Sequence, residues 1–115
     1  MKMTLLLIAL GFKLMASALF NKTFRKKIRY INRTVVIRTA DGKHSHTYIF
    51  RRNRVFFHPG GSKNATVELI WSDKDTALKV MLSKEELDTF SAMGKGDLVI
   101  KGNFQDALWF TEIAA

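Results

Sequence analysis

Short alternating segments between residues 34 and 58 limit the possible folds more than any other feature of this chain. Thr34–Thr39 is rich in β-branched residues, and Asp41-Gly42 follows it as a pair typical of a tight hairpin turn. Residues 46–52 continue with alternating side chains, and residues 55–58 form a third such segment before Pro59-Gly60-Gly61. These segments predict three consecutive antiparallel strands.

Two further strands are predicted in the second half of the chain. Residues 65–71 alternate, with Val67, Leu69 and Trp71 on the side that we expect to face the core. Residues 97–101 form the fifth strand. The elements do not follow a regular strand-helix-strand repeat, so the predicted fold class is α+β, with about five strands in a mostly antiparallel sheet covered on one face by helices.

Three helices are predicted around these last two strands. Residues 76–82 have apolar side chains at helical spacing after a capping box at Ser72, although their alternation also fits a strand. Residues 83–93 repeat the capping pattern and end before two glycines. A last helix is capped by Asn103, and the residues that turn towards the sheet are Phe104, Ala107, Leu108 and Trp109.

Residues 4–20 are almost entirely apolar, and three interpretations of this segment compete. A secretory signal would use the run 5–12 and would be cleaved at the small residues Ala16-Ser17-Ala18. A membrane-spanning helix would be short for that role and would carry Lys13 near its centre. We favour an apolar helix that packs its broad apolar side on the sheet or lies in a lipid interface.

The composition fits one packed domain over residues 1–115, since 47% of the residues are hydrophobic and 25% are charged. We divide it into an N-terminal apolar and basic helix at residues 1–31 and a sheet-and-helix core at residues 34–113. The chain has no cysteine, which excludes disulfides, thiolate metal sites and cysteine nucleophiles. Stability must therefore come from the core, and we expect a cytoplasmic protein.

The net charge of +9 is concentrated between residues 21 and 54, where the only acid is Asp41. Five of these basic residues directly follow the apolar segment and are here called the basic cluster: Lys22, Arg25, Lys26, Lys27 and Arg29. We expect the basic cluster to lie against an anionic membrane surface, peripherally or with the apolar segment as an anchor at the inner membrane. A solvated helix end is the alternative interpretation.

A second group of basic residues suggests a different partner. Arg51, Arg52 and Arg54 occur among four aromatic residues, a combination that suits stacking on bases and contacts to phosphates: Tyr48, Phe50, Phe56 and Phe57. The strand alternation places Tyr48 and Phe50 opposite Arg51, so these rings should be buried where the charge is exposed. We therefore do not expect nucleic acid as a partner.

The sequence contains no arrangement of side chains that predicts catalysis or a metal site. His44 and His46 share one face of an extended segment, but a third ligand is not evident, and solvated turn histidines are the favoured interpretation. A nucleophile-elbow motif is missing, and Gly94-Lys95-Gly96 is too short for a phosphate-binding loop. We expect no enzyme activity and no cofactor.

Residues 98–103, with the sequence LVIKGN, resemble the strand-glycine-helix ending of sterol-carrier-protein-2-like (SCP2-like) domains. Three upstream segments resemble the family in the same order, namely a strand and turn at 34–42, a hairpin at 48–57 and a strand at 65–69. The likeness covers most of the chain, from Thr34 to Ile113. The stretch between Ser72 and Gly96 is shorter than in many members, and the N-terminal part is reduced to one apolar helix.

The resemblance implies a protein that holds an apolar lipid of the fatty acyl, sterol or isoprenoid type in a tunnel between sheet and helices. The shorter helical cover implies a smaller or more open cavity. We predict that the apolar ligand contacts eight residues that share one interior space: Ile37, Phe50, Phe57, Leu69, Trp71, Met81, Phe90 and Trp109. A membrane-associated adaptor with a filled core is the alternative function, and a partner protein or a second copy of the chain remains open.

Overall fold

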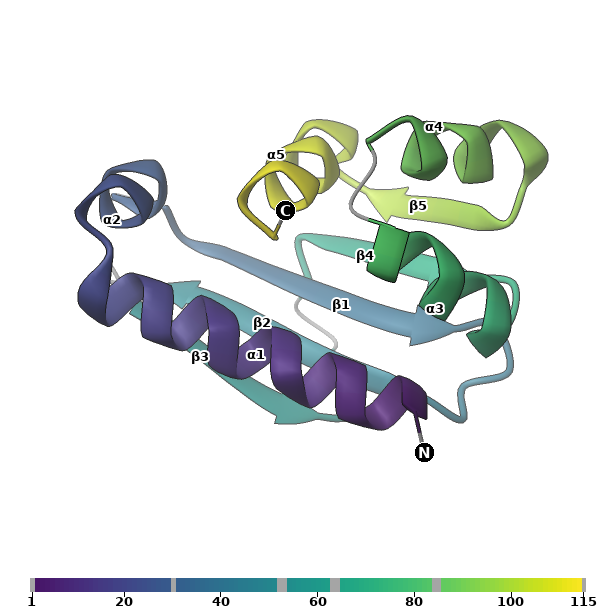
Figure 1. Ribbon diagram of the computed structural model, residues 1–115, viewed down its shortest axis with the longest axis horizontal. Helices are drawn as coiled ribbons and strands as arrows, with labels where there is room; N and C mark the ends of the chain where they lie inside the picture. The colour runs from purple at the N-terminus through teal and green to yellow at the C-terminus, as the bar shows by residue number, and fades with distance from the viewer. Residues whose placement is uncertain (1, 30, 52–53, 63–64, 84–85, 115) are drawn as a thin grey trace.

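The computed structural model describes residues 2–29, 31–51, 54–62, 65–83 and 86–114, and it shows an α+β fold with five strands and five helices in this part of the chain (Figure 1). The elements run in the order α1 (Lys2–Phe20), α2 (Lys22–Ile28), β1 (Arg33–Thr39), β2 (Ser45–Arg51), β3 (Arg54–Pro59), β4 (Val67–Trp71), α3 (Lys74–Ser83), α4 (Glu86–Lys95), β5 (Leu98–Gly102) and α5 (Phe104–Ala114). The predicted fold class is confirmed, and the segment at 76–82 is helical.

The sheet has the strand order β3-β2-β1-β4-β5. Three of its strand pairs are antiparallel, and β1 pairs with β4 in parallel, with Val35 opposite Val67. The three-stranded meander predicted from the alternating segments is formed by β1, β2 and β3. The connection from β3 to β4 must therefore pass both β2 and β1 to reach its place in the sheet.

The two faces of the sheet differ in what covers them. The inner face carries buried apolar side chains at every second position, and the helices pack on it: Val35 and Ile37 from β1, Tyr48 and Phe50 from β2, and Val67, Leu69 and Trp71 from β4. On the outer face, Thr47 donates a hydrogen bond to the carbonyl oxygen of Gly60 at 2.8 Å. The chain after β3 thus passes over the outer face, and Val36 and Thr47 are fully buried there.

Helix α1 packs along β3 and β2 through one stripe of side chains, Met3, Leu7, Leu14 and Ala18, which are all buried. The hydroxyl of Tyr48 donates a hydrogen bond to the carbonyl oxygen of Leu7 at 2.6 Å and joins the helix to the sheet. Gly11 lies on the same stripe, directly over the ring of Phe57. The interpretation that this segment packs on the sheet is therefore the one that the structure adopts.

The N-terminal part contains two helices, so the prediction of a single helix over residues 1–31 was wrong. Asn21 has an extended backbone, and its side-chain oxygen accepts a hydrogen bond from the backbone N–H of Phe24 at 3.1 Å. This capping contact ends α1 and begins α2, because an asparagine at the N-cap satisfies a backbone donor that the helix leaves free. Phe24 and Ile28 are the buried residues of α2.

The glycine in the LVIKGN motif has a specific structural role. Gly102 has φ +105°, and a Cβ atom on it would lie 2.6 Å from the carbonyl oxygen of Thr66 in the neighbouring segment. Only glycine fits this left-handed and crowded position. Asn103 then accepts hydrogen bonds from the backbone N–H groups of Gln105 and Asp106 at 3.0 and 3.3 Å, so it caps α5 as predicted.

Two details of the later helices differ from the sequence predictions. The cap of α3 is Asp73 and not Ser72, because the carboxylate of Asp73 accepts a hydrogen bond from the backbone N–H of Thr76 at 2.7 Å. This bond also lowers the pKa of Asp73. Phe104 is exposed at the start of α5, and this helix instead buries Ala107, Phe110 and Ile113. The second predicted capping box spans residues 84–85 and lies outside the described residues.

Candidate apolar ligand site

Seven of the eight residues predicted to contact an apolar ligand belong to one hydrophobic cluster between the sheet and the helices. Ile37, Phe50, Leu69 and Trp71 are buried, and the remaining three of the seven are partly buried and pack against the cluster: Phe57, Met81 and Trp109. Phe90 contradicts the prediction, because its side chain is 49% exposed on α4. Ala92, two residues further along the same helix, is buried. Whether these residues contact a lipid stays a prediction.

An aromatic group fills the part of this cluster between the sheet and α5. The ring centroid of Phe50 lies 4.9 Å from that of Trp109 and 6.0 Å from that of Phe110, and both ring pairs meet edge to face. Tyr48 continues the group, with centroids at 5.8 Å from Phe110 and 6.2 Å from Phe57. Tyr48 and Phe110 were not among the predicted contact residues, although the strand alternation places Tyr48 beside Phe50 on the inner face.

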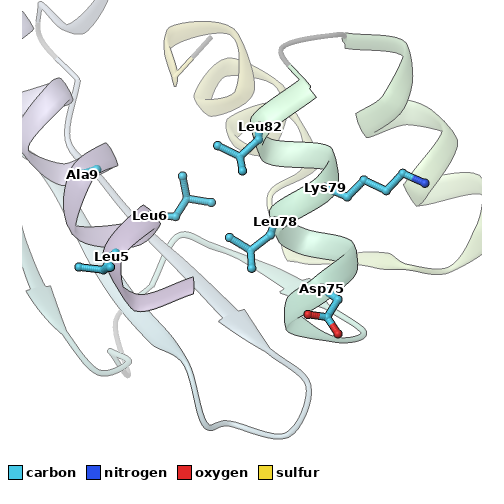
Figure 2. A pocket seen from close by; sticks show the side chains of 7 residues that line it. All are labelled: Leu5, Leu6, Ala9, Asp75, Leu78, Lys79 and Leu82. Carbon is cyan, nitrogen blue, oxygen red and sulfur yellow. The ribbon is translucent and has the colours of Figure 1, made fainter. Parts of the chain in front are cut away.

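A groove of about 560 Å³ lies between α1 and α3. Figure 2 shows its walls, with Leu5, Leu6 and Ala9 on α1 and with Asp75, Leu78, Lys79 and Leu82 on α3. The volume is within the range of about 300 to 1,000 Å³ that is typical of small-molecule sites. None of the eight predicted residues lines this groove, because the sequence does not reveal that α1 and α3 lie side by side.

The side of α1 that faces away from the sheet is also apolar. Leu5, Ala9, Phe12, Ala16 and Leu19 recur at helical spacing, and the three larger ones are 57–64% exposed. Phe20, at the end of the helix, is 83% exposed, and Leu82 of α3 adds to this surface across the groove. We call these seven residues the apolar stripe. Large contiguous apolar surfaces on a soluble domain mark interaction sites for proteins, ligands or membranes.

Residues Met3–Phe20 of α1 form the one helix in the described chain that is long and apolar enough to cross a membrane, with a mean hydropathy of 2.0. Core helices and signal sequences near the N-terminus share these properties. In this structure the helix packs one side on the sheet and exposes the other.

The basic cluster follows the apolar stripe directly. All five of its side chains are exposed on α2 or just after it, while Phe24 and Ile28 anchor the helix below them. Arg25, Lys26 and Lys27 lie in the last turn of α2, where positive charge interacts favourably with the helix dipole. Contact of the basic cluster with an anionic membrane stays a prediction.

His44 and His46 are not the solvated turn residues that were predicted. His46 is buried on the inner face of β2, and this burial lowers the pKa of its imidazole. His44 is partly buried, and its Nδ1 lies 3.3 Å from the hydroxyl oxygen of Thr4 in α1. Within the described residues, no group of three or more His, Cys, Asp or Glu side chains could hold a metal ion.

The aromatic residues near the arginines are divided between the two faces of the sheet. Tyr48, Phe50 and Phe57 lie on the inner face, as expected, and Tyr48 is so well buried that the pKa of its phenol is raised. Phe56 is exposed and shares the outer face with Arg54. A single exposed ring beside arginine does not form a continuous stacking platform for nucleic acid. Arg52 lies outside the described residues.

Comparison with known proteins shows the fold to be that of sterol carrier protein 2. The sterol carrier protein domain 2 of Helicoverpa armigera has a TM-score of 0.66 with this chain, with 13% sequence identity over 92% of this chain and 82% of that one. Palmitated SCP2L2 from Aedes aegypti has a TM-score of 0.61, with 15% identity over 91% and 90% of the two chains. The chain therefore has an SCP2-like α+β fold, as its sequence resemblance predicted. No protein-family model and no curated protein matches the sequence.

A ubiquinone synthesis protein and an alkylsulfatase also match this fold. A UbiJ-SCP2 ubiquinone synthesis protein has a TM-score of 0.64, with 16% identity over 89% of this chain and 83% of that one. The sec-alkylsulfatase Pisa1 from Pseudomonas sp. has a TM-score of 0.58 over 78% of this chain, which corresponds to 13% of the sulfatase. SCP2-like folds thus occur both as nearly whole chains and as a small part of an enzyme.

Proposed function

We propose that this protein binds a long apolar lipid without catalysing a reaction. The observation that carries the proposal is the α1–α3 groove, which lies over a sheet whose inner face is lined by aliphatic and aromatic side chains. The same fold is found in sterol carrier protein 2 domains, one of which is described as palmitated. Burial of a hydrocarbon chain contributes about 25 cal/mol per Å² before ordering costs, and an apolar groove of this size offers that burial.

The proposed setting is an anionic membrane surface on the cytoplasmic side, where the domain is held peripherally or through α1 as an anchor at the inner membrane. The apolar stripe and the basic cluster are adjacent along the chain and are both exposed, the combination that interfacial helices use. Each basic residue near an anionic surface contributes about 1 kcal/mol of attraction. A lipid-binding groove beside such a surface would allow the ligand to pass between bilayer and protein without crossing water.

Lipid binding is tested by native mass spectrometry of the purified protein and by titration with a fluorescent fatty acid. Leu82→Glu places a charge in the groove and should weaken binding at least tenfold. Val99→Glu is the matched control, because Val99 is similarly exposed but lies on the outer face of β5. Absence of co-purified lipid, together with no uptake of the probe, would leave the membrane-associated adaptor as the function.

Membrane binding is tested by co-sedimentation with neutral and anionic vesicles. Reversing the charges of Lys26 and Lys27 to Glu should release the protein from anionic vesicles, and added salt should have the same effect. Lys43→Glu changes the charge in the turn between β1 and β2 and serves as the control. Equal binding to both vesicle types would contradict the electrostatic part of the proposal.

A further inference from the structure

The outer face of the sheet carries two matching groups of side chains, one at each edge strand. At the β5 edge, Ile70 of β4 pairs with Val99, and the adjacent pair on the same face is Glu68 with Lys101. Opposite charges on neighbouring strands stabilise each other, and Glu68 also forms an ion pair with Arg38 at 3.3 Å. The cations at this edge therefore have an acid beside them.

The group at the β3 edge has a similar apolar pair but a different charged pair. Ile49 of β2 pairs with Phe56 of β3, and the next pair on that face is Arg51 with Arg54. Phe56 is 49% exposed, Ile49 is partly exposed, and both arginines are exposed. We call these four residues the hairpin patch. Like charges directly opposite each other destabilise a sheet, so the arginine pair is an electrostatic cost that the fold carries.

No acidic side chain in the described part of the chain offsets this cost. Neither Arg51 nor Arg54 forms an ion pair there, whereas Arg33 and Arg38 both do. The one acid between residues 21 and 54 is Asp41, in the turn at the opposite end of β2. Salt screens exposed charges beyond about 10 Å, and β2 spans seven residues of roughly 3.3 Å each. Among the described residues, the hairpin patch therefore has no counter-charge.

The hairpin patch faces away from the surface that we propose to meet the membrane. Helix α1 packs on the inner face of β3 and β2, where Gly11 lies over the ring of Phe57, and the apolar stripe follows the far side of this helix. The hairpin patch lies on the other side of the same two strands. With the apolar stripe in a bilayer, the hairpin patch is turned to water and stays open to a soluble partner.

We propose that the hairpin patch binds an acidic segment of a partner protein, in which an aliphatic or aromatic side chain lies among carboxylates. The carboxylates contact Arg51 and Arg54, and the apolar side chain packs on Phe56 and Ile49. Arginine suits this role because its planar guanidinium binds a carboxylate through two hydrogen bonds. A single exposed ring offers no succession of stacking platforms for a nucleic acid. Access to the patch on a membrane rests on the proposed function, but binding of the segment in solution does not.

The test measures fluorescence anisotropy of a labelled peptide that has one Leu-Phe pair between two runs of three Glu residues. A second peptide with Gln in place of Glu keeps the apolar pair and removes the charge. Wild-type protein should bind the acidic peptide about tenfold more tightly than the Gln peptide, and added salt should reduce this preference.

Three variants locate the binding site of the acidic peptide. Arg54→Glu should weaken binding about tenfold, because it turns an attraction into a repulsion. Phe56→Ser should weaken it about fivefold, because it removes apolar contact area without a change of charge. Lys101→Glu is the matched control: it makes the same change of charge at an exposed position of the outer face on the other edge strand, and should alter binding less than about twofold.

The outcomes separate this inference from the lipid-binding proposal. Equal binding of the two peptides, or equal effects of Arg54→Glu and Lys101→Glu, would refute the hairpin patch and leave lipid binding untouched. Tighter binding of a labelled single-stranded oligonucleotide would assign the patch to nucleic acid instead. Release of Arg54→Glu protein from anionic vesicles, to the extent expected for the reversal of Lys26 and Lys27, would make the patch a membrane contact and would also overturn the inference.

Two further results complete the test. Specific binding of the acidic peptide by a protein that takes up no lipid would support the hairpin patch while the lipid-binding proposal fails. If the variants do not fold, the backbone amide resonances of wild-type protein decide. Shifts at Ile49 and Phe56 on addition of the acidic peptide support the patch, and unchanged resonances at these positions refute it.

Discussion

Replacing Gly11 by alanine tests how closely α1 packs on the sheet. A Cβ atom at this position would lie 2.5 Å from Cγ and 2.5 and 2.7 Å from the two Cδ atoms of Phe57. These atoms form the root of the ring and not its tip, so rotation of the ring does not remove the overlap. Either α1 must lift away or the β3 strand must shift.

Two effects of opposite sign decide the result. Alanine in place of glycine inside a helix stabilises by about 1 kcal/mol. Overpacking of a tight contact costs roughly 1 to 3 kcal/mol. Because the approach is well below any normal contact distance, we expect the upper part of that range and a net loss of about 1 to 2 kcal/mol in the free energy of unfolding for Gly11→Ala.

Urea denaturation followed by circular dichroism measures this change. Gly94→Ala is the matched control, since Gly94 also lies in a helix, α4, but a Cβ there would meet nothing within 4 Å. It should stabilise the protein by up to about 1 kcal/mol. The penalty of Gly11→Ala should also shrink in a Phe57→Leu background. A Gly11→Ala protein as stable as wild type would refute the close packing of α1 on β3.

Three further predictions concern stability. Gly102→Ala combines a left-handed backbone with a clash against Thr66 and should lower the unfolding free energy in urea by about 3 kcal/mol. His46 has a pKa lowered by burial, so the unfolded state binds its proton more readily; stability should fall as the pH drops below about 6.5, and this slope should flatten in His46→Leu. Arg33→Gln leaves the buried Asp106 carboxylate without its ion pair and should lower the free energy of unfolding by about 2 kcal/mol. This is less than for a fully buried pair, because the Arg33 side chain is 37% exposed. Adding Asp106→Asn should restore part of the lost stability, which thermal unfolding measures.

The strand register could be predicted from the sequence because alternation depends only on neighbouring residues. Leu69 and Trp71 are buried on the inner face, as their spacing in residues 65–71 indicated. The same holds for Asn103, because an N-cap is a contact within a few residues. The likeness of LVIKGN to SCP2-like domains was informative for a physical reason, since Gly102 occupies a position that other residues cannot adopt.

The groove and the burial of His46 could not be predicted, because they depend on contacts between distant segments. Leu5 and Leu78 meet only once α1 and α3 are placed on the same sheet. His46 was interpreted as a turn residue because helix α1, which covers this end of β2, lies about 40 positions earlier in the chain. The contact between Thr4 of α1 and His44 shows this separation. Phe90 was predicted to be inside because helical spacing identifies an apolar face, but it does not reveal that the small Ala92 fills the contact.

The position of α1 before the strands that it covers has a consequence for biosynthesis. The helix ends at Phe20, whereas Phe57, against which it packs, is synthesised 37 residues later. At about 5 to 20 residues per second, the ribosome needs roughly 2 to 7 s to make that stretch. During this interval both the sheet-facing side and the apolar stripe of α1 lack their folded neighbours. In the membrane setting proposed above, a bilayer would compete with the nascent sheet for the helix during this interval.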